Sequence, residues 1–169
     1  PNTVAGAIRA VAGLGVAVVN VHASGGPAML DAARDAAESV GGTSRPLVIA
    51  VTVLTSMDDG DLSAVGQTPP AEEQVVRLAQ LTQNHGLDGV VCSPAEIEPI
   101  RAACGPEFKL IVPGIRPDWA ASGDQKRITT PRQARDRGAD MLVIGRPITG
   151  ADDPAAAAAR IAEKLGVSA

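Results

Sequence analysis

The sequence predicts an α/β fold, namely a parallel sheet that forms about the last five strands of a (β/α)8 TIM barrel. Short runs rich in valine, isoleucine and leucine, apolar on both faces, alternate with amphipathic segments. The last two apolar runs are each followed closely by glycine and arginine, and loops after the last two strands are where such barrels often bind phosphate. We therefore expect residues 1–169 to form a single partial barrel domain containing strands 4 to 8.

The predicted strands are short because glycine, proline and polar residues bound each apolar run. Their alternation with helical segments over short connections favours a parallel sheet with right-handed crossovers. The predicted strands cover residues 16–21, 47–54, 89–92, 110–113 and 141–144.

Helices between these strands are predicted from their apolar stripes and their ends. Ser93 and Thr130 each open a capping box that contains a proline. In one helix Val75, Leu78 and Ala79 share a face, as expected for a helix that covers a sheet. Weaker helix starts are Gly26-Pro27, Thr68-Pro69 and Asp153-Pro154, and predicted stops are Gly15, Gly86, Gly105, Gly138 and Gly166.

Composition excludes several classes of protein. The formal net charge is −4 and basic residues are dispersed, which argues against a nucleic-acid interface. No apolar run approaches the ~20 residues that span a membrane. Cys92 and Cys104 lack the spacing of metal or redox motifs, which favours reduced thiols and a cytoplasmic location. The aromatic fraction is only 1%, so the core has to be aliphatic.

Arg116 and Arg146 are the strongest candidate site residues. Each follows a predicted strand and a glycine, where the backbone leaves room for a ligand and the guanidinium offers several donors to an anion. Gln125 lies in the polar loop between them. A surface salt bridge is the usual role of a single arginine, but two at corresponding strand ends favour a phosphate site.

Several other residues have two readings each. The segment 58–66 has the length of a functional lid, and Thr55 and Ser56 before it either contact a ligand ring or serve only the turn. His22 ends a strand without a nucleophile nearby, since Ser24 lacks the spacing of a nucleophile elbow, and we expect a structural role. Similarly, His85 is expected to interact with a helix C-terminus.

Three more residues are not expected to take part in catalysis. Asp88 and Asp140 precede strands, at the end of the barrel that usually serves stability. Trp119 is expected in a loop, as a candidate part of a lid. Acidic residues and histidines nowhere show the spacing of a metal site, and we expect no metal or cofactor.

A set of motifs follows one order along nearly the whole length of the chain: Pro1-Asn2-Thr3, residues 20–26, 50–57 and 87–93, Pro113-Gly114-Ile115-Arg116-Pro117, Gly123-Asp124-Gln125 and Ile144-Gly145-Arg146-Pro147. Through these motifs the chain resembles the bacterial orotidine 5'-phosphate decarboxylases. The resemblance implies a homodimeric TIM barrel without metal or cofactor that converts orotidine monophosphate to uridine monophosphate in pyrimidine biosynthesis.

The resemblance implies roles for single residues. Arg146, the Gly145 amide and Gln125 would hold the 5'-phosphate, and Arg116 would belong to the same end of the substrate site. Thr55 would lie near the pyrimidine. Thr3 would contact the ribose in the partner subunit's site, which implies a homodimer for the intact protein.

The family's alternating aspartates and lysines have no counterpart in this chain, because their central segment precedes the Ile-Pro-Asn-Thr motif that begins here at Pro1. We therefore expect a fragment without catalytic residues, inactive on its own. Two alternatives remain. One is another phosphate-binding barrel enzyme, such as a hexulose-phosphate synthase or a pentose-phosphate epimerase. The other is a non-catalytic half-barrel that binds phosphate or nucleotide.

Overall fold

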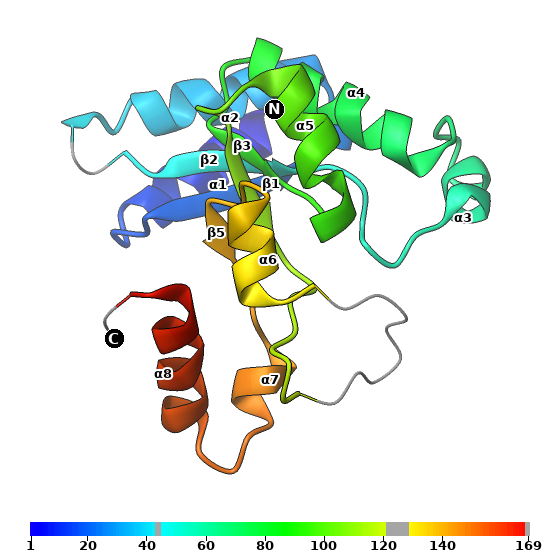
Figure 1. Cartoon of the computed structure of the whole chain (residues 1–169). Helices are drawn as coiled ribbons and strands as arrows, with labels where there is room; N and C mark the ends of the chain where they lie inside the picture. Colours follow the sequence, from blue (N-terminus) through cyan, green and yellow to red (C-terminus); the bar gives the residue numbers. More distant parts are fainter. Residues whose placement is uncertain (43–44, 121–128, 168–169) are drawn as a thin grey trace.

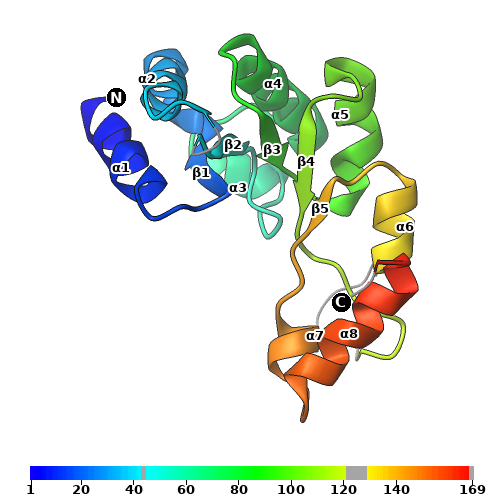
Figure 2. The ribbon, with the colours of Figure 1, turned by 90° about the vertical axis from the view of Figure 1, so that its left-hand side faces the viewer.

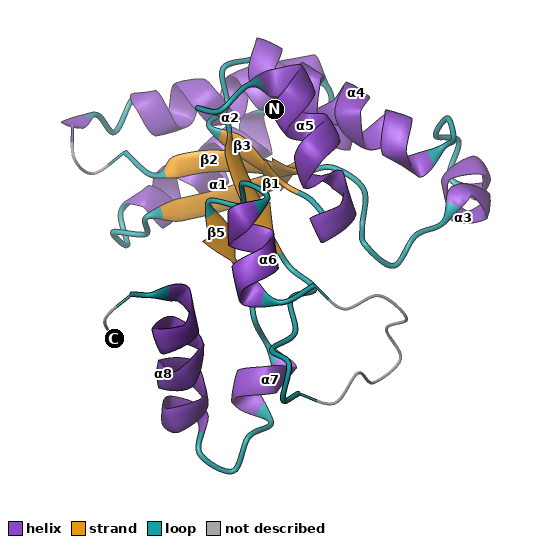
Figure 3. Ribbon diagram, in the orientation of Figure 1, coloured by secondary structure: helices purple, strands orange, loops and turns teal. Residues whose placement is uncertain are grey.

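The computed structural model describes residues 1–42, 45–120 and 129–167, and its sheet confirms the predicted parallel α/β fold (Figures 1 and 3). Five strands pair in parallel in the order β1-β2-β3-β4-β5. Each of the five overlaps a predicted strand, with ends that differ by up to three residues, and β5 has only two residues. The strands are β1 (Val18–His22), β2 (Leu47–Val51), β3 (Gly89–Val91), β4 (Lys109–Val112) and β5 (Met141–Leu142).

Sequence neighbours are also neighbours in the sheet, which places the covering helices on one side. When every right-handed crossover steps in the same direction, the crossing helices share one face, as in a barrel, whereas a doubly wound sheet reverses its order. Figure 2 shows α1, α2, α4 and α5 side by side over one face of the sheet. The α-helices are α1 (Asn2–Ala12), α2 (Pro27–Glu38), α3 (Asp59–Ala64), α4 (Ala71–Asn84), α5 (Ile97–Cys104), α6 (Pro131–Asp136), α7 (Arg146–Thr149) and α8 (Pro154–Leu165).

The core between sheet and helices is aliphatic, as the composition predicts. Ala50, Val90 and Leu110 stand in register on three adjacent strands and are fully buried. Leu30 of α2 and Val75 of α4 are fully buried in the same cluster. Burial of these side chains, worth about 1.5–3 kcal/mol for each large one, fixes the layer of helices on the sheet.

Most predicted helix starts are confirmed. Ser93 forms its capping box at the short 3-10 helix η3 (Pro94–Glu96), and Thr130 forms one at α6. Asp153 accepts the Ala156 N–H at the start of α8. The start at Thr68-Pro69 is wrong, since α4 begins at Ala71 after an extended Pro70. A residue that precedes proline avoids the helical conformation. Pro69 precedes Pro70 and is therefore kept out of the helix.

The loop predicted for 58–66 is also wrong in part. Residues Asp59–Ala64 form α3, which is capped reciprocally by Asp58 and Asp61 through their side chains and backbone N–H groups. Leu62 of this helix is fully buried. The Asp58 side chain thus bonds to nearby backbone, and this helix cap explains why a short polar segment becomes helical.

Candidate functional site

Arg116 is held close to the carboxyl end of β4 by its backbone. Gly114 has a φ of 78°, a conformation that suits glycine, and turns the chain out of the strand. Ile115 then forms an isolated parallel bridge with Thr129, and the Arg116 N–H donates to the Thr129 carbonyl at 3.1 Å. The Arg116 side chain is thus anchored at its base, and the residue is only 9% exposed.

Arg146 occupies the equivalent place after the neighbouring strand. It is the first residue of α7, and Gly145 is the N-cap of that helix. The Gly145 carbonyl accepts the N–H groups of Ile148 and Thr149 at 2.8 and 3.0 Å. Arg146 thus begins the short helix that follows β5, and it lines the same pocket as Arg116.

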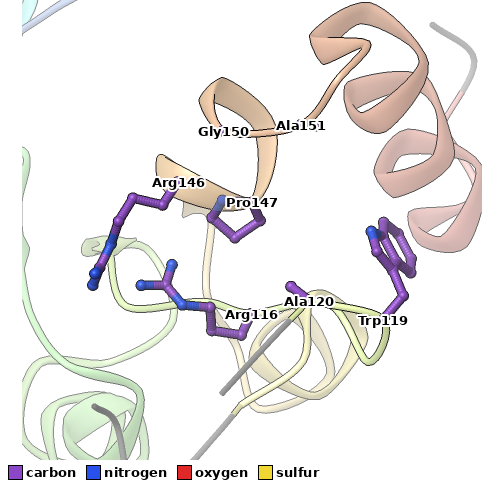
Figure 4. Close-up of a pocket in the computed structure, with 7 residues that line it drawn as sticks. All are labelled: Arg116, Trp119, Ala120, Arg146, Pro147, Gly150 and Ala151. Atoms are coloured by element: carbon purple, nitrogen blue, oxygen red, sulfur yellow. The ribbon is translucent and has the colours of Figure 1, made fainter. Parts of the chain in front are cut away.

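Both arginines line one pocket of about 420 Å³, as the sequence predicts (Figure 4). In the close-up the two guanidinium groups reach towards the same space. Within the described residues, the Arg116 guanidinium makes no ion pair or side-chain hydrogen bond. The other lining residues are Trp119, Ala120, Pro147, Gly150 and Ala151.

This arrangement favours an anion. Arg116 is buried and loses part of its hydration, whereas Arg146 is exposed at the mouth of the same pocket. A bound anion offsets the cost of burying the Arg116 charge. Guanidinium groups bind carboxylate or phosphate through paired hydrogen bonds. Of these two groups, phosphate carries the larger negative charge and has more acceptor oxygens than a carboxylate. The pocket is therefore suited to a phosphate group with further room for the molecule that bears it.

The remaining predicted contacts are not brought into this pocket. Thr55 is exposed and follows β2 at the same carboxyl end of the sheet, but it does not line the pocket. Thr3 is exposed on α1 and does not line it either. Gln125 lies outside the described residues, as does the motif Gly123-Asp124-Gln125. The proposed roles of these three residues stay predictions.

The two histidines stand apart from the pocket. His22 ends β1 and is exposed, so burial gives no support to the structural role expected for it. His85 is the C-cap of α4, as expected, and its Nδ1 lies 2.8 Å from Asp31 Oδ1. That hydrogen bond holds the pKa of the Asp31 carboxyl below its ordinary value, and Arg34 adds to the effect.

The cysteines are unsuited to nucleophilic chemistry. Burial raises the pKa of Cys92 to about 12 and also raises that of Cys104. A thiol that stays protonated is a poor nucleophile and a poor metal ligand. Across residues 1–42, 45–120 and 129–167, no three histidine, cysteine or acidic side chains gather in a group that could hold a metal ion.

Sequence reasoning missed how the pocket wall is fixed. Trp119, expected in a loop, lines the pocket and also packs on α8, where the Arg160 guanidinium lies 3.9 Å from its ring centroid. The Lys164 ammonium lies 4.7 Å from the same centroid and 2.6 Å from the Asp118 carboxylate oxygens. The sequence does place Arg160 and Lys164 four residues apart, on one face of a helix. It does not reveal their partners, Trp119 and Asp118, because these contacts depend on tertiary packing.

The fold and the pocket define a class: an α/β protein with part of a (β/α)8 barrel and an anion pocket after its last two strands. A family model described as "Orotidine 5'-phosphate decarboxylase / HUMPS family" matches residues 1–161. None of the described helices has both the length and the apolar character needed to cross a bilayer.

Relatives and solved structures agree with that match. The orotidine 5'-phosphate decarboxylase of Paramagnetospirillum magneticum is 56% identical over 99% of this chain and 72% of its own length. The one from Rhodospirillum rubrum is also 56% identical, over 98% of this chain and 68% of its own. The crystal structure of orotidine 5'-phosphate decarboxylase from Lactobacillus acidophilus matches with a TM-score of 0.85 and 38% identity, over 99% of this chain and 71% of that one.

The chain belongs to the orotidine 5'-phosphate decarboxylase / HUMPS family, and the resemblance seen in the sequence is confirmed. Its sheet is part of the TIM barrel of that family. Relatives at this identity carry the decarboxylase name, so the comparisons do not favour the alternatives of a hexulose-phosphate synthase or a pentose-phosphate epimerase.

Proposed function

We propose that this chain holds the 5'-phosphate of orotidine monophosphate and of its product, uridine monophosphate, in the pocket of Arg116 and Arg146. The observation that carries the proposal is the approach of two arginines, from successive strand-to-helix connections, to one pocket. Arg116 is buried and has no counter-ion among the described residues, and a phosphate supplies one. The family is named for a reaction whose substrate is a nucleotide with a 5'-phosphate, and this phosphate is the group that the pocket would hold.

The other nucleotide contacts follow from the resemblance. Gly145 adjoins Arg146 at the start of α7, where its amide can serve the phosphate. Gln125 would complete the phosphate site and Thr55 would face the pyrimidine. Thr3, exposed on α1, would reach the ribose in a partner subunit's site, which would make the functional unit a homodimer. The two reduced thiols expected for Cys92 and Cys104 support a cytoplasmic location.

No lysine among the described residues lines the phosphate pocket, where it could protonate the ring carbon during decarboxylation. Loss of carbon dioxide leaves negative charge on the ring carbon, which a fixed ammonium group stabilises and protonates. Lys109 lies at the amino end of β4, 3.4 Å from Asp140, and Lys164 of α8 pairs with Asp118 in the turn after Arg116. The third lysine, Lys126, lies outside the described residues. We therefore expect the polypeptide 1–169 alone to bind uridine monophosphate without decarboxylating orotidine monophosphate.

The test is a calorimetric titration of the chain with uridine monophosphate and with uridine. Arg116→Met and Arg146→Met keep much of the side-chain length and remove the charge. Each is expected to lower the affinity for the monophosphate roughly 10- to 100-fold, since a hydrogen bond to a charged group is worth about 1.5–3 kcal/mol. Arg9→Met, at an exposed position on α1, is the charge-matched control and should bind as the parent does.

Equal affinity for uridine and uridine monophosphate would contradict the proposal, as would unchanged binding by both arginine variants. A parallel assay follows the absorbance change when orotidine monophosphate loses its carboxylate. We expect binding without turnover, and turnover by the isolated chain would show that a residue of this chain supplies the proton.

A further inference from the structure

The turn that follows Arg116 is tied to α8 at two points. Lys164 Nζ lies 2.6 Å from each carboxylate oxygen of Asp118, and this contact lowers the pKa of that carboxyl. The Arg160 guanidinium lies over the Trp119 ring, 3.9 Å from its centroid. Since Arg160 and Lys164 are four residues apart on one helix, they present their charges on the same face.

The same turn forms part of the wall of the anion pocket. Trp119 and Ala120 both line that pocket, and the Ala120 N–H donates to the Pro117 carbonyl at 3.0 Å. Arg116, whose backbone is fixed by Thr129 on its other side, lies directly before this turn. A change in the path of the turn therefore changes both the wall of the pocket and the setting of the Arg116 side chain.

We propose that Arg160 and Lys164 are positioning residues for the anion pocket, acting through Trp119 and Asp118 without touching the ligand. This inference rests on the proposed function, in which the pocket holds the nucleotide phosphate. Neither residue lines the pocket. Their role is to raise the fraction of molecules whose turn is already in the binding conformation, because apparent affinity falls in proportion to that fraction.

The contacts of Lys164 and Arg160 are too exposed to contribute much to the stability of the fold. The side chains of Lys164 and Asp118 are 42% and 61% exposed, and ion pairs this exposed contribute little to folding. The cation–π contact of Arg160 is likewise at the surface of α8. Loss of either contact should therefore leave the unfolding transition nearly unchanged while loosening the turn.

The test compares variants of the 169-residue chain by calorimetric titration with uridine monophosphate and with inorganic phosphate. Arg160→Met and Lys164→Met are each expected to weaken both ligands about two- to fivefold, the range set by a surface cation–π contact of about 0.5–1 kcal/mol. Arg160→Lys keeps a cation over the ring and should restore most of the affinity. The control is Arg132→Met, which breaks the exposed ion pair of Arg132 with Asp136 on α6 and should bind as the parent does.

A second arm separates positioning from simple attraction of the anion by positive charge. Trp119→Leu leaves both cations in place and removes the ring through which Arg160 acts. The proposal expects Trp119→Leu to weaken binding about as much as Arg160→Met, and the double variant to be no weaker than either alone. If charge attraction were the cause, the effects of Trp119→Leu and Arg160→Met would add, and a double variant weaker than either single variant would overturn the proposal.

Thermal unfolding, followed by circular dichroism, checks that each titrated variant is folded. If one of the two α8 variants fails to fold, the other still tests the proposal. A parent that binds while Arg160→Met and Lys164→Met bind equally well overturns this proposal alone. A parent that binds neither ligand contradicts the proposed function, and this proposal with it.

Discussion

Asp88 and Asp140 make the same two-bond ring with the strand beside them. Asp88, just before β3, accepts the Val48 N–H at 2.6 Å through Oδ2 and donates its own N–H to the Val48 carbonyl at 2.9 Å. Asp140, just before β5, accepts the Leu110 N–H at 2.8 Å and donates to the Leu110 carbonyl at 3.0 Å. Through these paired hydrogen bonds, Asp88 and Asp140 hold neighbouring strands together at the amino end of the sheet, which is the structural role expected for them.

These rings predict a stability effect. Asp88→Ala leaves the Val48 N–H without its carboxylate and leaves Arg45, 3.1 Å away, without its partner. We expect a loss of about 1.5–3 kcal/mol in the free energy of unfolding, measured by urea titration. Asp88→Asn keeps an acceptor oxygen and should lose less. Equal stability of Asp88→Ala and the parent would show that the ring contributes nothing.

Asp140 predicts a pH dependence. Burial works to raise its pKa, but the hydrogen bond from Leu110 and the Arg101 guanidinium outweigh burial, and its pKa lies below the ordinary 3.8. A lowered pKa in the folded state contributes stability that is present above the unfolded value and lost as pH falls through the folded value. Asp140→Asn should therefore flatten the decline of stability below about pH 4, measured by urea unfolding at several acid pH values. A decline as steep as the parent's would contradict this.

Two glycines predict opposite effects of the same substitution. A Cβ atom at Gly89 of β3 would overlap the backbone carbonyl oxygen of Lys109 in β4, so Gly89→Ala should lower stability by about 1–3 kcal/mol. At Gly6, inside α1, a Cβ atom meets nothing within 4 Å, and alanine should stabilise the helix by about 0.5–1 kcal/mol. Thermal melting curves of the two variants test both signs, and a common sign would refute the packing argument.

Trp119 predicts a spectroscopic signal. It is the single tryptophan of the sequence and it lines the anion pocket. Uridine monophosphate bound there changes the surroundings of the ring, so intrinsic fluorescence should shift in a saturable way with the affinity found by calorimetry. Arg146→Met should move the midpoint to higher concentration. A fluorescence that ignores saturating ligand would place the ligand away from Trp119.

Local signals in the sequence predicted most of the fold. The capping boxes at Ser93 and Thr130 and the five apolar strands depend on residues close in the chain, and all are present. The convergence of Arg116 and Arg146 followed from a rule of parallel sheets, in which successive strand ends meet at one edge.

What the sequence left out depends on packing between distant segments or on competing local signals. The contact of Trp119 with Arg160 joins two segments about forty residues apart, and no periodicity encodes it. The segment of α3 looked like a loop because its aspartates and glycine favour turns, yet the cap formed by Asp58 and the burial of Leu62 decide for a helix.

The central claim is that Arg116 and Arg146 together hold the phosphate of a nucleotide. A crystal structure of the chain with uridine monophosphate tests it most directly. We predict phosphate oxygens within hydrogen-bonding distance of both guanidinium groups, in the pocket that Trp119 and Pro147 also line. A nucleotide bound elsewhere, or one whose phosphate contacts neither arginine, would contradict the account.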